Sequence, residues 1–119
     1  MHEASLAGGV LRVVEQAALD EGFARVTLLR LEVGQLAGVE MRALQFALDS
    51  IAPGTLLEGA RIDYVELPGM AWCLPCGLRS PLARRGEPCV HCGGYQLQPV
   101  EGTEFRVSEM LVEDQQSGH

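Results

Sequence analysis

Residues 73–93 read CLPCGLRSPLARRGEPCVHCG and contain all four cysteines of the chain. These form two Cys-x-x-Cys pairs with twelve residues between the pairs, namely Cys73, Cys76, Cys89 and Cys92. Each pair can turn two thiolates toward one point, and a tetrahedral metal ion needs two such pairs to complete its coordination. Gly77 and Gly93 follow the second cysteine of each pair, where a residue without Cβ lets the backbone fold back tightly. The stretch therefore predicts a structural four-cysteine zinc site in a ribbon-like module.

Other uses of the four cysteines are weaker or stay open. Two disulfides would need an oxidising compartment, and the opening residues do not have the pattern of a secretory signal. A redox Cys-x-x-Cys normally occurs once, at the start of a helix, whereas here it occurs twice around a loop. The spacing alone does not separate zinc from iron, so a one-iron electron-transfer site remains an alternative. His91 lies between two of the cysteines and is a candidate substitute ligand.

Composition narrows the class of protein. With 119 residues, the chain makes one small domain with, at most, a metal-stapled appendage. No apolar run approaches the length that spans a bilayer. The net charge of −7 argues against a nucleic-acid backbone as the main partner, because such backbones require clustered cations. We therefore expect a cytoplasmic protein with neither a membrane segment nor a nucleic-acid partner.

Two segments have the apolar spacing of helices. The first covers residues 4–21 and ends before Gly22, with apolar residues at Leu6, Val10, Val13, Val14, Ala17 and Ala18. The second covers residues 39–51 and stops before Pro53-Gly54. Its stripe consists of Met41, Leu44, Leu48 and Ile51.

Three segments have the character of strands. Residues 25–33 are rich in β-formers, with one face made by Thr27, Leu29, Leu31 and Val33. Residues 60–66 alternate in the same way, and residues 103–113 form a third strand through Phe105, Val107 and Leu111. Because a metal loop cannot easily supply hydrogen-bonding neighbours, we expect the third strand to return to the sheet of the first two.

These elements predict an α+β fold. It has a small three-stranded sheet with two helices on one face, plus an inserted four-cysteine zinc-ribbon-like module. We expect a main α/β domain made of residues 1–69 with the returning strand 100–113. The zinc-binding module occupies residues 70–99, and residues 114–119 form a frayed tail.

The first three residues, Met1-His2-Glu3, have the chemistry of a terminal metal site. A bulky second residue prevents removal of the initiator Met, so the α-amine, the His2 backbone nitrogen and the His2 ring can chelate one ion. A planar set of nitrogen donors suits Ni(II) or Cu(II). The first amides of the following helix have no intrahelical acceptor, so deprotonating one of them breaks no helical hydrogen bond. The alternative is that Glu3 merely favours the helix start and His2 is exposed.

The whole sequence resembles the HypA/HybF family of nickel metallochaperones, which serve maturation of [NiFe]-hydrogenase. The match covers residues 1–113. It rests on the N-terminal triplet, on both Cys-x-x-Cys-Gly pairs, and on three further segments: Leu31-Glu32-Val33-Gly34, Gly38-Val39-Glu40 and Ala43-Leu44-Gln45-Phe46-Ala47.

The resemblance implies two metal sites. Nickel is expected at Met1, His2 and Glu3, with His2 as the indispensable side chain and the other two acting largely through backbone nitrogens. Zinc is expected at the four cysteines. Glu40 matches an acidic position of some relatives and is a candidate fifth nickel ligand, although an acidic residue at a helix start is ordinarily a dipole partner.

The resemblance also implies the partners. These are a HypB-type GTPase and the large subunit of a hydrogenase, and in some organisms also urease maturation proteins. The chain is then a carrier, monomeric or weakly dimeric, and not an enzyme. The alternative is a zinc-ribbon module that binds nucleic acid or protein, for which three loop arginines are the local support: Arg79, Arg84 and Arg85.

Overall fold

The computed structural model describes residues 2–114, which divide into two compact units. The first unit contains residues 2–31, 40–63 and 107–114, and the second contains residues 32–39 and 64–106. Of the tail expected at 114–119, only Asp114 lies among the described residues, as the last residue of a strand.

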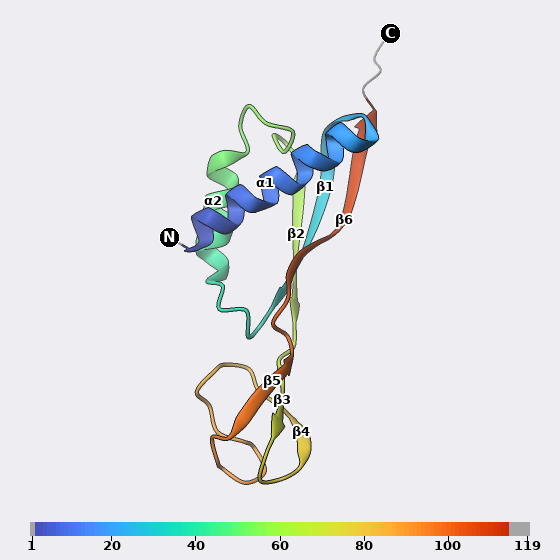
Figure 1. Cartoon of the computed structure of the whole chain (residues 1–119). Coiled ribbons are helices and arrows are strands. Elements are labelled where there is room, and N and C mark those ends of the chain that lie inside the picture. The colour runs from blue at the N-terminus through green and yellow to red at the C-terminus, as the bar shows by residue number, and fades with distance from the viewer. Residues whose placement is uncertain (1, 115–119) are drawn as a thin grey trace. The chain divides into compact units, whose positions relative to one another are not determined.

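Two helices contact each other in the first unit: α1 (His2–Glu21) crosses α2 (Met41–Ile51) with its N-terminal part (Figure 1). The stripe predicted for α2 is confirmed at its centre, because Leu44 and Leu48 are fully buried. In α1 the buried residues are Ala7, Val10 and Val14, spaced three and four apart. The prediction that Val13 joins this face is wrong, since Val13 is 53% exposed and Ala7 takes the buried place.

Three long strands form the first sheet: β1 (Phe23–Gly34), β2 (Arg61–Leu67) and β6 (Phe105–Asp114). Their order is β2-β1-β6, which confirms that the last strand returns to the sheet begun by the first two. In the first unit, Thr27 Oγ1 donates to the Leu111 carbonyl at 3.2 Å, and Ser108 Oγ donates to the Arg30 carbonyl at 3.4 Å. The two pairs progress in opposite directions along β1 and β6, so these strands are antiparallel.

The predicted inner face of β1 is correct for Leu29, Leu31 and Val33, all of which are buried. It is wrong for Thr27, which is exposed and uses its hydroxyl on the neighbouring strand, while Val26 is buried instead. Leu111, which the sequence placed in the third strand, is 51% exposed. Strict alternation therefore holds only over the central part of β1.

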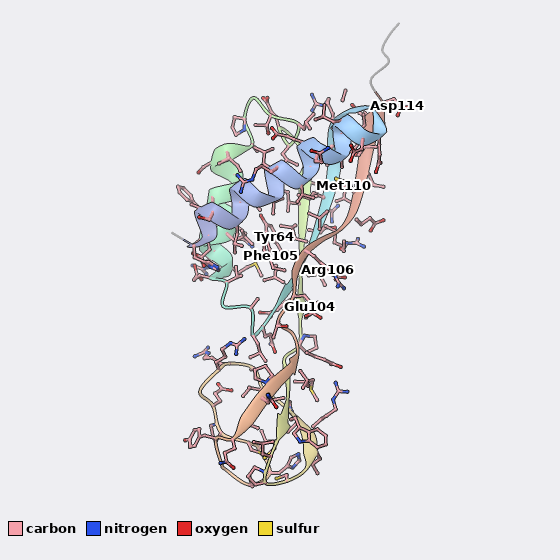
Figure 2. The ribbon with its side chains drawn as sticks, in the orientation of Figure 1. Tyr64, Glu104, Phe105, Arg106, Met110 and Asp114 are labelled. Atoms are coloured by element: carbon pink, nitrogen blue, oxygen red, sulfur yellow. The ribbon has the colours of Figure 1, made fainter. Side chains whose placement is uncertain are left out.

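Charged pairs join the strands on their solvent side. Arg30 of β1 lies 2.7 Å from Glu109 of β6 and 3.7 Å from Asp63 of β2. In the second unit, Arg106, labelled in Figure 2, lies 2.6 Å from Glu32. Exposed ion pairs of this kind contribute about 0–1 kcal/mol each to the free energy of unfolding. They therefore help to specify which strands lie next to β1 but add little to the stability of the fold.

The second unit contains a sheet of its own, which the sequence did not reveal. Its strands are β3 (Met70–Cys73), β4 (Leu78–Pro81) and β5 (Leu97–Glu101). Both outer strands pair antiparallel with β3, in the order β4-β3-β5. A small apolar core beside this sheet consists of Leu36, Ala71 and Leu82, with Leu97 packed against it.

Three backbone segments of the second unit meet at Gly34, Gly69 and Gly102, which we call the glycine crossing. A Cβ on Gly34 would overlap the carbonyl of Gly102, and a Cβ on Gly102 would overlap the backbone of Gly69. Next to it, the Leu36 N–H donates to the Gly102 carbonyl at 2.7 Å. The absence of side chains is therefore what lets these segments approach.

We expect Gly34→Ala to lower the free energy of unfolding by about 2–3 kcal/mol, because the added methyl must displace backbone. The matched control is Gly9→Ala in α1, where the new Cβ would meet only the end of Arg12 at 3.9 Å. That change should raise the free energy of unfolding by about 1 kcal/mol. Chemical denaturation of both variants measures the difference. If both variants changed the free energy of unfolding equally, the glycine crossing would not be tightly packed.

Among the described residues, no helix combines the length and the apolar character that crossing a membrane requires.

Candidate metal centres

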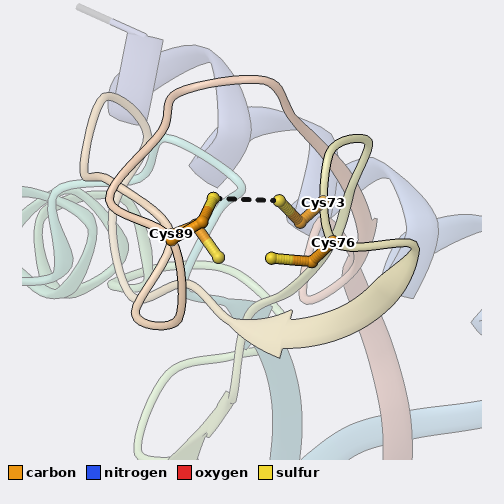
Figure 3. Close-up of side chains that lie close together, drawn as sticks. Cys73, Cys76 and Cys89 are labelled. Carbon is orange, nitrogen blue, oxygen red and sulfur yellow. Dashed lines mark hydrogen bonds between the residues drawn. The ribbon is translucent and has the colours of Figure 1, made fainter.

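The four cysteines converge in the second unit. Their Sγ atoms all lie within 4.8 Å of one another, and the Sγ atoms of Cys73 and Cys92 are 3.6 Å apart. Tetrahedral zinc with Zn–S bonds of about 2.3 Å places its sulfurs about 3.8 Å apart. Figure 3 shows the sulfurs of Cys73, Cys76 and Cys89 facing one another. All four are free cysteines. Their arrangement is that of a four-thiolate metal-binding site.

The two Cys-x-x-Cys-Gly segments fold in the same way. The Gly77 N–H donates to the Cys73 carbonyl at 2.8 Å, and the Gly93 N–H donates to the Cys89 carbonyl at 2.9 Å. Both glycines have positive φ, +66° and +74°. A residue with a Cβ rarely adopts this conformation, which is why glycine follows each pair.

Backbone N–H groups also point at the sulfurs. The His91 N–H donates to Cys89 Sγ at 3.4 Å, and the Gly94 N–H donates to Cys92 Sγ at 3.4 Å. Backbone donors from Cys92 and His91 lower the pKa of the Cys89 thiol to about 6. A hydrogen bond with the Cys92 thiol raises the pKa of Cys76 to about 12. Without metal, one thiolate is thus already stabilised beside protonated thiols.

His91 contributes its backbone to this centre. Within residues 2–114, the group of side chains able to hold a metal consists of the four cysteines without His91. The His91 imidazole is therefore not part of this cluster.

The N-terminal candidates lie in the first unit. Met1 falls outside the described residues. His2 begins α1, and its side chain is 58% exposed. Glu3 Oε2 lies 3.8 Å from His2 Nδ1 and accepts a hydrogen bond from the backbone N–H of Glu40 at 2.8 Å. The structure thus brings together His2, Glu3 and Glu40.

Glu40 is the N-cap of α2, with φ −85° and ψ 109°. Its Oε1 accepts a hydrogen bond from the Ala43 N–H at 2.9 Å. The N–H of Glu40, in turn, is the main cause that lowers the pKa of Glu3 below its usual value. Glu3 is therefore a carboxylate held in place beside an exposed imidazole.

Known proteins are similar in sequence to this chain over nearly its whole length. The sequence profile described as "Hydrogenase/urease nickel incorporation, metallochaperone, hypA" matches residues 1–112. The chain belongs to the HypA family.

Relatives support this assignment over the whole length. The chain is 64% identical over 115 residues to the hydrogenase maturation factor HypA of Polaromonas naphthalenivorans, covering 97% of this chain and 100% of that protein. It is 64% identical over 114 residues to the factor of the same name from Cupriavidus necator, covering 96% of each. The solution structure of the Ni metallochaperone HypA from Helicobacter pylori has the same fold, with a TM-score of 0.68 and 16% identity. That likeness covers 95% of this chain and 98% of the other.

The loop arginines of this HypA-family chain do not favour the nucleic-acid alternative. Arg79 pairs with Glu101, and Arg85 Nε donates to the Leu36 carbonyl at 3.2 Å. Two of the three arginines are thus engaged within the second unit. Only a small group of positive charges is left in this loop to bind the phosphate backbone of a nucleic acid.

Sequence reasoning missed an apolar hollow between α1 and α2. Its volume is about 350 Å³, and it is lined by Glu3, Ala4, Ala43, Phe46, Ala47, Ser50 and Ile51. The available signal was Phe46, a large aromatic residue that lies off the apolar stripe of α2 and is 74% exposed. An isolated exposed aromatic is ordinary on a protein surface, so the signal was weak.

Proposed function

We propose that this HypA-family chain binds Ni(II) at its N-terminus and delivers it for maturation of [NiFe]-hydrogenase. The observation that carries the proposal is the exposed His2 imidazole at the first turn of α1, beside the anchored carboxylate of Glu3. The donors are the Met1 α-amine, backbone nitrogen and the His2 ring. Nitrogen donors in a plane suit Ni(II).

The helix start accommodates such a site. The first N–H groups of α1 have no acceptor within the helix, so a deprotonated amide removes no helical hydrogen bond. A cation at this end opposes the helix dipole by about 0.3–1 kcal/mol at an exposed site. The deprotonated amide and the Glu3 carboxylate offset that cost because both carry negative charge close to the ion.

The proposed role is that of a carrier without catalysis. A carrier must hold nickel against competitors and still release it to another protein. A site with only a few nitrogen donors at an exposed terminus allows the ligands of the recipient protein to replace those donors one by one. The proposed partners are a HypB-type GTPase and the large subunit of a hydrogenase, and free cysteines are consistent with a reducing cytoplasm.

We also propose that the four-cysteine site holds zinc as a structural ion. The 3.6 Å sulfur separation and the closed set of four thiolates support this, because structural zinc sites leave no open position. In this proposal the second unit provides a fixed surface for partner proteins, and the first unit binds the nickel ion that is delivered.

Zinc binding to metal-free protein should release protons. At pH 7, Cys89 with a pKa of about 6 is mostly thiolate, whereas Cys76 with a pKa of about 12 is protonated. Because the pKa of Cys73 is also raised, at least two protons must leave on binding. As the pH falls through about 6, Cys89 adds a further proton and zinc affinity falls. Calorimetric titration in buffers of different ionisation enthalpy counts these protons. A count near zero at pH 7 would contradict this prediction.

Metal content tests the proposed function. Protein purified without an N-terminal tag should carry one tightly bound zinc and, after nickel addition, one exchangeable nickel per chain. Iron in place of zinc would be visible as an absorbing tetrathiolate. Nickel that binds only to protein whose cysteines have been emptied would overturn the assignment of two separate sites.

A further inference from the structure

Within residues 2–114, Ser80 is the one polar residue whose side chain is fully buried. It lies in β4, where the other three residues are exposed and Ser80 points inward. Its partner in the register of the sheet is Ala71, which is also fully buried. An apolar residue is the ordinary occupant of such a position, because a hydroxyl buried without a hydrogen bond costs about 1–3 kcal/mol.

The hydroxyl of Ser80 contacts a sulfur of the four-cysteine cluster. Its Oγ lies 3.9 Å from Cys89 Sγ, within hydrogen-bond reach of the large sulfur atom. When Cys89 is a thiolate, its sulfur carries no proton, so the hydroxyl is the donor. The contact runs from the strand that follows the first cysteine pair to a cysteine of the second pair, nine residues later. Ser80 therefore joins the two halves of the cluster.

Cys73 is an internal reference for this contact. Cys73 and Cys89 are both buried, with exposed fractions of 0% and 2%. Among the described residues, the hydroxyl that reaches a cysteine sulfur is that of Ser80, and it reaches Cys89. The Sγ of Cys73 lies 3.6 Å from that of Cys92 instead. The two buried sulfurs thus differ in hydroxyl contact rather than in access to solvent.

From this arrangement we propose that Ser80 is a positioning residue of the four-cysteine site, whose hydroxyl holds the Cys89 thiolate and makes it a weaker nucleophile. A hydrogen bond to a thiolate stabilises its negative charge, and a stabilised thiolate attacks electrophiles more slowly. Side chains that hydrogen-bond to metal ligands change metal affinity by about 10–100-fold. The inference rests on the proposal that this site holds zinc, and it adds a residue outside the ligand set to the determinants of that site.

The experiment uses the zinc-loaded full chain and compares Ser80→Ala with the pair Ser80→Thr and Ser80→Val, which have the same shape and differ in the hydroxyl. Leu82→Val is the matched control, because it trims the apolar core beside the sheet without removing a polar contact. Iodoacetamide is the probe: the sulfur forms a bond to its carbon as iodide leaves. Mass spectrometry gives the alkylation rate of each cysteine, and competition with a chromophoric chelator gives the zinc affinity.

We expect Ser80→Ala to lower zinc affinity about tenfold, at the lower end of the usual range because the contact is long. The alkylation rate of Cys89 relative to Cys73 should rise about threefold, since nucleophilicity follows roughly the square root of thiol basicity. The variant should still hold one zinc per chain, because structural zinc contributes about 10–16 kcal/mol. Ser80→Val should resemble Ser80→Ala, and Ser80→Thr should resemble the unchanged protein. The control should melt at a lower temperature with an unchanged ratio of the two rates.

A Cys89 to Cys73 rate ratio that is the same in Ser80→Ala as in the unchanged protein would overturn the inference. Equal acceleration at all four cysteines would also overturn it, because Ser80 would then serve packing alone. If Ser80→Ala did not fold, the ratio in Ser80→Val against Ser80→Thr would decide in the same way. Zinc content tests the proposed function separately. An unchanged protein that binds no zinc would reject the structural zinc ion, whereas a failure confined to the Ser80 variants would reject this inference alone.

Discussion

Replacing His2 with Ala should lower the affinity for Ni(II) by about a hundredfold or more, equivalent to at least about 2.8 kcal/mol of binding free energy. The imidazole is the one side-chain donor of the proposed chelate, and its loss leaves the amine and backbone nitrogen without the second chelate ring. His2 is exposed at the start of α1, so its removal should not change the free energy of unfolding. Chelator competition measures the affinity, and denaturation measures the stability.

The control for this prediction is His91→Ala. That imidazole lies in the second unit, outside the group of side chains able to hold a metal. The variant should bind one nickel with unchanged affinity. If His91→Ala and His2→Ala lowered the affinity equally, nickel would be bound by scattered histidines rather than by the terminal site.

Cys73→Ser should empty the four-cysteine site and unfold the second unit. Cys73 is fully buried in β3, and its sulfur is 3.6 Å from that of Cys92. A structural zinc ion contributes apparent binding free energy of about 10–16 kcal/mol in small zinc modules, and their sheets are too small to fold without it. We expect zinc to be lost and amide protection to disappear from β3, β4 and β5.

Ser80→Ala is the matched control for the cysteine change. Ser80 is also fully buried, and its Oγ lies 3.9 Å from Cys89 Sγ, so the variant alters the surroundings of the site but keeps all four thiols. It should retain one zinc per chain. Elemental analysis and hydrogen exchange distinguish the two variants, and a Cys73→Ser protein that keeps zinc and a protected β3 would contradict the four-thiolate site.

Local patterns made the main elements and the cysteine cluster predictable. The spacing within residues 73–93 brings the sulfurs together with little help from distant residues. The stripe of α2 and the alternation from Leu29 to Val33 were equally readable, because each buries one face. The sheet of the second unit was not predicted, since β3 and β4 have four residues each and are too short to display alternation.

Errors arose where tertiary contacts override a periodic pattern. Val13 fits the helical stripe as well as Ala7 does, and only packing places Ala7 inside. The bond between Glu3 and the Glu40 N–H joins residues on different helices, which no local motif specifies. The sequence did contain a hint, because an N-cap followed by Ala43 at N3 leaves that N–H in need of an acceptor.

The central claim is that nickel binds to the beginning of the chain itself. The most direct measurement is a nickel titration of protein with its native N-terminus against protein extended by Gly-Ser before Met1. The extension moves the α-amine away from His2, so we expect one tightly bound nickel in the native protein and a loss of affinity of about a hundredfold in the extended one. Equal affinity and equal stoichiometry in the two proteins would contradict a terminal nickel site.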